Sequence, residues 1–142
     1  MGYMKPLYTA VVTASGGRDG HVKSEDGIID FDVTTPKELG GDGGQATNPE
    51  QLFASGYAAC FDGALNLMLS KAKKKADTTV TANVSIGKDE AEGDGLKLAV
   101  RLDVSIPDMD REEAQQFIEK AHAFCPYSKA TRNNVDVTLN LV

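Results

Sequence analysis

The chain has 142 residues, and 15 Lys and Arg against 21 Asp and Glu give it a formal net charge of −6. This length suits one domain spanning residues 1–142. The acidic balance argues against nucleic acid or an anionic membrane as the main partner. We expect no membrane span, since no run of about 18 apolar residues occurs, and the N-terminus does not resemble a signal peptide. Two cysteines are too few for a disulfide scaffold, so we expect a protein of the reducing cytoplasm.

Three strands are predicted in the first third of the chain. Residues 7–14 are rich in β-branched and aromatic side chains, and residues 21–25 and 28–34 form two further strands. Asp26-Gly27 is a two-residue hairpin signal between the last two. A flexible glycine-rich loop follows at residues 40–44. We do not expect that loop to bind phosphate, because no Lys-Ser or Lys-Thr follows it.

A long helix is predicted from Pro49 to about Lys74. Thr47-Asn48-Pro49-Glu50 offers a capping oxygen, a proline near the first helical position and a glutamate three residues after the threonine. Between Phe53 and Leu69 the helix is apolar on nearly every face, which is typical of a buried helix. One chain has too little sheet to cover such a helix, so we expect a homodimer.

The remaining pattern completes an α+β fold. Apolar and polar residues alternate over 78–87 and over 96–106, which predicts two strands joined by a polar hairpin loop. Asp108 or Asp110 caps a second predicted helix, which ends at Pro126. Apolar and polar residues alternate over 135–141, which predicts the last strand. The predicted order is β-β-β-α-β-β-α-β, with sheet wrapped around the central helix.

Cys60 and Cys125 allow two interpretations. Free cysteines are often small buried apolar residues, and both can be that. Catalysis by Cys60 would need an activator, because burial disfavours the thiolate. The helix dipole fades within one turn, and Cys60 lies about 15 Å from Glu50 along the helix. A nearby cation could serve instead: one Arg at about 4 Å contributes roughly 4 kcal/mol at a dielectric constant near 20. Arg18, on a glycine-flanked turn, is the candidate.

Several motifs together resemble the organic hydroperoxide resistance (Ohr) branch of the Ohr/OsmC superfamily, over nearly the whole chain. They are Gly17-Arg18-Asp19-Gly20, residues 40–44 leading into Thr47-Asn48-Pro49-Glu50-Gln51-Leu52-Phe53-Ala54, Gly56-Tyr57-Ala58-Ala59-Cys60-Phe61, Cys125-Pro126-Tyr127-Ser128 and Thr131-Arg132-Asn133-Asn134-Val135. The resemblance implies an intertwined homodimer of α+β subunits with active sites at the subunit interface. It also implies a peroxidase that reduces organic and fatty-acid hydroperoxides without a bound cofactor or metal.

Site roles follow from the same resemblance. Cys60 matches the peroxidatic cysteine and Cys125 the resolving cysteine, so that a Cys60–Cys125 disulfide forms during turnover. Arg18 matches the arginine that holds thiolate and peroxide, and Glu50 the glutamate that pairs with it. A lipoyl dithiol, usually on a lipoylated protein, is the implied reductant. Three aromatic residues near Cys60 would suit an apolar peroxide, although core packing is the simpler explanation for each one singly: Phe53, Tyr57 and Phe61.

Other functions remain as alternatives. An OsmC-type peroxidase would share the cysteine chemistry. A non-catalytic carrier of hydrophobic ligands would use the buried helix and glycine loop to shape a pocket. A Cys-His hydrolase is disfavoured, because His21 and His122 lie in no nucleophile motif and are expected to be surface or packing residues. The spacing of the cysteines and histidines matches no metal-ligand pattern.

Overall fold

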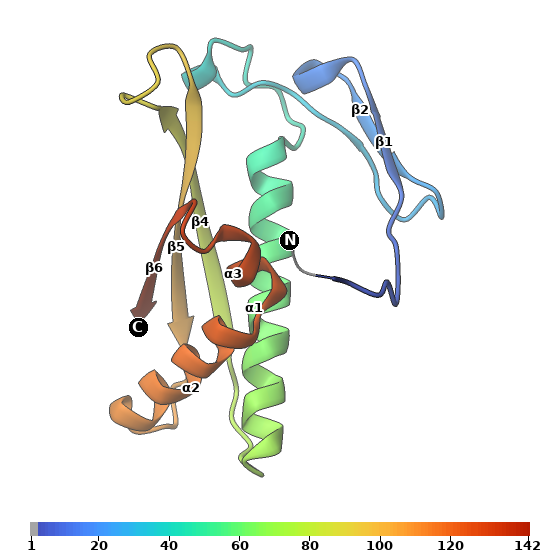
Figure 1. Cartoon of the computed structure of the whole chain (residues 1–142). Coiled ribbons are helices and arrows are strands. Elements are labelled where there is room, and N and C mark those ends of the chain that lie inside the picture. Colours follow the sequence, from blue (N-terminus) through green and yellow to red (C-terminus); the bar gives the residue numbers. More distant parts are fainter. Residues whose placement is uncertain (1–2) are drawn as a thin grey trace. The chain divides into compact units, whose positions relative to one another are not determined.

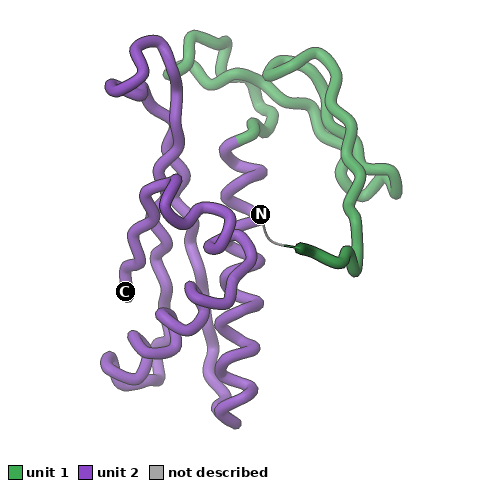
Figure 2. The backbone as a smooth tube through the Cα atoms, in the orientation of Figure 1, with its two compact units in different colours: residues 1–49 green, residues 50–142 purple. Residues whose placement is uncertain are grey.

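The computed structural model describes residues 3–142, and the chain forms two compact units, residues 1–49 and 50–142 (Figure 2). Each unit contains one three-stranded sheet. The α+β class and the predicted order of strands and long helices are confirmed, with one further short helix near the C-terminus (Figure 1).

The first unit is built on an antiparallel sheet in the order β1-β2-β3. Its strands are β1 (Val12–Ser15), β2 (His21–Ser24) and β3 (Asp30–Asp32), with the 3₁₀ turns η1 (Gly17–Asp19) and η2 (Lys37–Leu39). The predicted strand over residues 7–14 is therefore too long. Its pairing with β2 begins at Val12, and Val11 adds one bond in which its carbonyl accepts from the Glu25 N–H.

The turn between β2 and β3 lies where Asp26-Gly27 predicts it, but it is wider than two residues. The Asp26 carboxylate accepts from the Ser24 hydroxyl at 2.6 Å and from the Ile28 N–H at 3.0 Å. Gly27 adopts a positive φ of 79°, which favours glycine. The Asp26 side chain thus organises a loop over residues 25–29, between the ends of β2 and β3.

The second unit is built around α1 (Pro49–Lys71), as the capping pattern predicts. The helix ends three residues earlier than expected. Lys73 adopts a left-handed φ of 56°, and the Lys74 N–H donates to the Leu69 carbonyl at 2.9 Å. This bond is the signature of a Schellman cap, with lysine at the position that glycine usually takes.

A second sheet lies beside α1 in the order β4-β5-β6. β4 (Thr79–Lys88) and β5 (Leu96–Ser105) are antiparallel, and β6 (Asp136–Leu141) runs parallel to β5. α2 (Arg111–Phe124) begins at Asp110, whose carboxylate accepts from the Glu112 N–H. α3 (Pro126–Thr131) was not predicted. Pro126 ends α2 and also starts α3, since proline is well suited to the first position of a helix.

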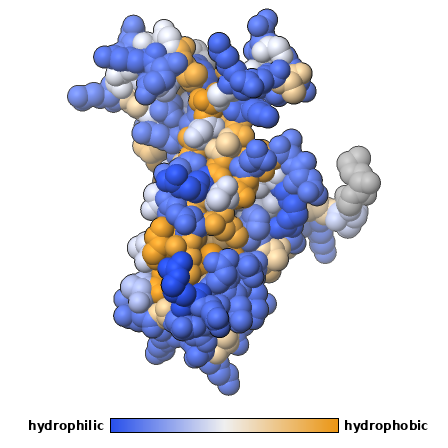
Figure 3. Space-filling view, turned by 90° about the vertical axis from the view of Figure 1, so that its left-hand side faces the viewer, coloured by the Kyte–Doolittle hydropathy of each residue, from blue (hydrophilic) through white to orange (hydrophobic). Residues whose placement is uncertain are grey.

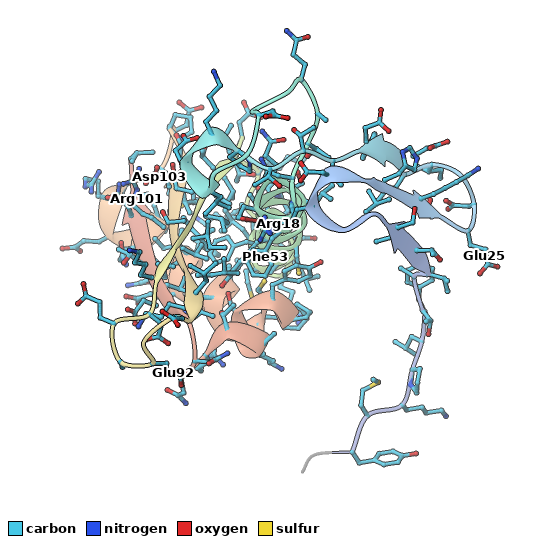
Figure 4. All side chains as sticks on the ribbon, turned by 90° about the horizontal axis from the view of Figure 1, so that it is seen from above. Arg18, Glu25, Phe53, Glu92, Arg101 and Asp103 are labelled. Atoms are coloured by element: carbon cyan, nitrogen blue, oxygen red, sulfur yellow. The ribbon has the colours of Figure 1, made fainter. Side chains whose placement is uncertain are left out.

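The core of the second unit lies between one face of the sheet, α1 and α2. Its largest fully buried side chains are Tyr57, Phe61, Leu65, Leu102, Ile118, Val104, Cys125 and Ser128. The other face of the sheet is polar. There Asp103 accepts from Arg101 at 3.1 Å, Asn83 at 2.9 Å and Asn140 at 2.9 Å (Figure 4).

Within one chain α1 is buried on one side only, whereas its composition predicts burial all round. Tyr57, Phe61, Leu65 and Leu69 are buried at spacings of four residues, but Leu67 is 38% exposed. Apolar side chains gather in a band on the face that Figure 3 shows. By length and composition α1 also meets the criterion for a membrane-crossing helix. The search of the sequence for about 18 consecutive apolar residues did not detect this property. Core helices of soluble proteins meet that criterion too, so it does not decide between the two settings.

Candidate functional site

The two cysteines lie side by side in the second unit, although 65 residues separate them in sequence. The Cys125 thiol donates to the Cys60 sulfur over an Sγ–Sγ distance of 3.5 Å. Cys125 is fully buried at the joint between α2 and α3, and Cys60 is partly buried in α1. A disulfide has a bond of about 2.05 Å. The two sulfurs are therefore in contact as free thiols, and a shift of about 1.5 Å would join them.

Burial raises the pKa of the Cys60 thiol above its ordinary value, and the neighbouring Cys125 thiol raises it further. The backbone N–H of Tyr127 hydrogen-bonds the Cys60 sulfur and opposes these effects, because a donor stabilises the thiolate. The net direction is upward. The environment that the second unit gives Cys60 therefore favours the neutral thiol, and thiolate chemistry needs additional positive charge.

Arg18 lies in the first unit, in the turn η1 between β1 and β2 (Figure 4). The turn is tight: a Cβ added at Gly20 would lie 1.8 Å from the Ser15 carbonyl oxygen, so only glycine fits there. Asp19 fastens the turn to Thr35, accepting from its N–H at 2.9 Å and its hydroxyl at 3.1 Å. Local bonds thus hold the loop that carries Arg18.

Glu50 lies in the first turn of α1, in the same unit as the cysteines. It precedes Cys60 by ten residues of continuous helix, or about 15 Å. Arg18 belongs to the other unit, so its placement beside Glu50 and Cys60 stays a prediction.

The aromatic residues near Cys60 form a cluster that includes one residue not singled out from the sequence. The Tyr127 ring lies 5.8 Å from that of Tyr57 and 6.4 Å from that of Phe53, which α1 carries (Figure 4). Tyr127 is 40% exposed, whereas Tyr57 and Phe61 are fully buried. Contact of Phe53, Tyr57 and Phe61 with a substrate stays a prediction. Tyr127 offers the more accessible ring.

Behind the cysteines lies a buried polar cluster that the sequence analysis missed, in which Tyr57 and Ser128 are fully buried and His122 is partly buried. The Ser128 hydroxyl lies 2.8 Å from the Tyr57 hydroxyl and 2.8 Å from Nδ1 of His122. Burial, and then the charge of Arg132, lowers the pKa of His122, which favours the neutral ring. The sequence points to Ser128 only as part of the Cys125-Pro126-Tyr127-Ser128 motif, and no pattern in the sequence joins it to Tyr57 or His122.

His21 lies apart, in the first unit. Its ring bonds Asp32 at 2.8 Å and Asp30 at 2.5 Å on the surface of the sheet. Over residues 3–142 no group of three or more His, Cys, Asp and Glu side chains is placed to hold a metal ion. The second unit offers a dithiol with a backbone N–H donor beside it.

Comparison with known proteins gives consistent results. Residues 41–140 match the model of the OsmC-like protein family. The organic hydroperoxide resistance protein OhrB of Bacillus subtilis is 53% identical over 135 residues, which cover 95% of this chain and 98% of that protein. The organic hydroperoxide resistance protein of Xanthomonas axonopodis pv. citri is 50% identical over 137 residues, covering 96% of each chain.

Solved structures agree with this relationship. The crystal structure of Bacillus subtilis OhrB has a TM-score of 0.89 at 50% identity and covers 96% of this chain and 100% of its own. An organic hydroperoxide resistance protein from Elizabethkingia anophelis, crystallised with thiocyanate bound, has a TM-score of 0.91 at 55% identity and covers 97% of this chain and 98% of its own. The chain belongs to the OsmC-like family, in its organic hydroperoxide resistance (Ohr) branch.

Proposed function

We propose that this protein is a thiol peroxidase that reduces organic hydroperoxides, including those of fatty acids, to alcohols. The observation that carries the proposal is the 3.5 Å contact between a partly buried thiol, Cys60, and a fully buried one, Cys125. Relatives about 50% identical are named for organic hydroperoxide resistance, which supports a role in peroxide resistance.

The proposed cycle has three steps. The Cys60 thiolate attacks one peroxide oxygen, the O–O bond breaks, and the alkoxide takes a proton to leave as the alcohol, so that Cys60 becomes a sulfenic acid. The Cys125 sulfur then attacks the Cys60 sulfur, and water leaves as the disulfide forms. A dithiol reduces this disulfide by exchange and is itself oxidised to a disulfide.

The unequal burial of the two thiols suits this order of events. Cys60 is partly exposed and can meet a peroxide, whereas Cys125 is 0% exposed and faces the Cys60 sulfur. A peroxide would therefore oxidise Cys60 first. The contact with Cys125 favours disulfide formation over a second oxidation to the sulfinic acid.

In this proposal Arg18 supplies the positive charge that Cys60 needs. An arginine at about 4 Å contributes roughly 4 kcal/mol at an effective dielectric constant near 20. Lowering a thiol pKa by about two units requires roughly 2.7 kcal/mol. Glu50 would orient the guanidinium through a two-bond contact. The backbone positions of Glu50 and Cys60 are about 15 Å apart along the helix, so either the side chain of Arg18 spans that interval or residues of two chains combine.

We also propose that the protein acts as a homodimer with active sites at the subunit interface. Val33 is the only buried residue among residues 3–49. The same segment exposes large apolar side chains: Leu7, Tyr8, Val11, Val12, Ile28 and Phe31. Apolar surface on this scale is typical of an interface, and a second copy that also presents one open side of α1 would match it.

The proposed reductant is a lipoyl dithiol on a lipoylated protein, in a cytoplasmic setting. Disulfide exchange with a dithiol needs only access to the Cys60 sulfur, which is the more exposed of the two. The chain itself would then need no bound cofactor.

One experiment tests the catalytic proposal. The reduced protein and its Cys60→Ser variant are each mixed with one equivalent of tert-butyl hydroperoxide, and free thiols and intact mass are followed. We expect rapid loss of both thiols and a mass loss of about two hydrogens in the wild type alone. Dihydrolipoamide should restore the thiols. If both thiols survive many equivalents of peroxide for minutes, Cys60 is structural and a carrier of hydrophobic ligands becomes the better interpretation.

A further inference from the structure

We propose that the buried polar cluster of Tyr57, Ser128 and His122 is a positioning device that holds α3 so that Cys125 and the Tyr127 N–H face Cys60. The device would set how fast the sulfenic acid of Cys60 is converted to the disulfide. This inference rests on the proposed peroxidase cycle and concerns its second step.

α3 needs such a device because it is short. It has six residues, and a helix of that length is not stable without tertiary contacts. Two groups at its start nevertheless meet the Cys60 sulfur: the Cys125 thiol, at the residue before Pro126, and the Tyr127 N–H. The position of α3 therefore determines both contacts.

Ser128 joins α3 to the two longer helices. It is 0% exposed, and its hydroxyl lies 2.8 Å from the Tyr57 hydroxyl of α1 and 2.8 Å from the His122 ring of α2. Thr131, also in α3, adds a second contact to the Tyr57 hydroxyl at 3.3 Å. One short helix is thus tied to both neighbours through hydroxyl groups.

The spacing of these bonds relates them to the cysteines. Tyr57 precedes Cys60 by three residues in α1, and His122 precedes Cys125 by three residues at the end of α2. Residues three apart lie on the same face of a helix. The hydrogen bonds of Tyr57 and His122 therefore lie on the same helix faces as the two thiols, about one helical turn toward the N-terminus.

The hydrogen-bonding capacities of the three groups match. The Tyr57 hydroxyl can donate to Ser128, and the Ser128 hydroxyl can donate to Nδ1 of a neutral His122. Among residues 3–142 no buried side-chain nitrogen or oxygen lacks a hydrogen-bond partner. A fully satisfied buried network favours a single arrangement of the elements it joins. Removal of the Ser128 hydroxyl would leave the His122 nitrogen without that partner.

The test compares Tyr57→Phe, Ser128→Ala and the double variant with wild type. Thr78→Ala is the matched control, because it removes a hydroxyl that bonds Asp62 elsewhere on α1. Each reduced full-length protein is mixed rapidly with tert-butyl hydroperoxide and quenched with an alkylating agent. Intact mass then separates thiol, disulfide and sulfinic acid.

The first loss of thiol is followed in every variant as the reference rate, because the Tyr127 N–H also bonds the Cys60 sulfur, and disulfide formation is compared with it. Disulfide formation should slow by about three- to tenfold in Tyr57→Phe and Ser128→Ala, the scale of a lost hydrogen bond to a buried partner. The sulfinic acid fraction should rise at excess peroxide. The double variant should resemble the more affected single variant, because the hydrogen bonds act as one unit. Thr78→Ala should match wild type.

The outcomes separate the two proposals. Disulfide formation that is equally fast in all variants, or effects that multiply in the double variant, would overturn the positioning role alone. Wild-type protein whose thiols both survive peroxide would overturn the peroxidase and the positioning role together. Tyr57→Phe keeps the aromatic ring, so it carries the test if Ser128→Ala does not fold.

Discussion

Gly56 gives Tyr127 the space it needs against α1, and filling that space should impair the site without unfolding the protein. A Cβ added at Gly56 would lie 2.8 Å from the Tyr127 hydroxyl oxygen and 3.1 Å from Cε2 of its ring. Non-bonded heavy atoms prefer separations of about 3.5–4.0 Å. In a Gly56→Ala variant the Tyr127 ring must therefore move by about 0.5–1 Å.

Two opposing effects on stability nearly cancel. Alanine in place of glycine within a helix contributes about 1 kcal/mol to the free energy of unfolding. Displacement of Tyr127 weakens its ring contacts with Tyr57 and Phe53, at 5.8 and 6.4 Å, each of which is worth about 0.5–1.5 kcal/mol. We therefore expect the thermal midpoint to change by less than about 2 °C. Disulfide formation should slow, because the Tyr127 N–H contacts the Cys60 sulfur.

Calorimetry and rapid-quench mass spectrometry on the same preparations measure the two quantities. Ser55→Ala is the control, because the Ser55 hydroxyl donates to the Gln51 carbonyl of the same helix, at 2.8 Å. It should gain about 0.5 kcal/mol from helix propensity and react like wild type. A Gly56→Ala variant that is stabilised by the full ~1 kcal/mol and forms the disulfide at the wild-type rate would refute the reasoning.

Three further predictions concern single groups. Cys125→Ser should leave the Cys60 sulfenic acid without a resolving thiol, so that intact mass shows sulfinic acid at excess peroxide and turnover with dihydrolipoamide stops; sustained turnover would contradict the resolving role. Arg18→Gln should raise the pKa of Cys60, measured by iodoacetamide alkylation against pH, because burial already raises that pKa and the proposed counter-charge is lost; identical titrations would contradict the role of Arg18. Asp32 and Asp30 accept hydrogen bonds from the His21 ring and raise its pKa. The contribution of His21 to stability is therefore complete below its unfolded pKa and is lost as pH rises through the folded pKa. The thermal midpoint of wild type relative to His21→Gln should therefore be higher at pH 5.5 than at pH 8.5, and a constant difference would contradict the reasoning.

Local signals were sufficient to predict most of the fold. The Thr47-Asn48-Pro49-Glu50 pattern places the start of α1 correctly, and Asp110 caps α2 as one of the two candidates. Alternation predicts β4, β5 and β6 within a residue or two, because only one face of that sheet is buried. The strand over residues 7–14 was overextended because its length depends on the partner β2, which composition does not reveal.

The site was harder to predict for physical reasons. The contact between Cys60 and Cys125 depends on how α1 packs against the joint of α2 and α3, and no spacing rule gives it; the family resemblance supplied the pair. α3 is too short for a periodic pattern. The bond between Tyr57 and Ser128 joins residues 71 apart, and no local pattern relates two residues at that separation.

The fold also indicates which side of the thiol pair moves when the disulfide forms. The sulfurs must approach by about 1.5 Å to reach bonding distance. Cys60 lies within 23 continuous helical residues, between the fully buried Tyr57 and Phe61. A shift there would disturb the core, which is close-packed and resists displacement. Cys125 instead lies at a joint, ending α2 through its N–H bond to the Ala121 carbonyl and preceding a helix of six residues. The backbone at Cys125 can adjust by a rotation of the shorter helix, α3. We therefore infer that Cys125 moves toward Cys60 when the disulfide forms. The hydroxyl groups that tie α3 to its neighbours are therefore placed where they direct the Cys125 sulfur toward Cys60 during that adjustment.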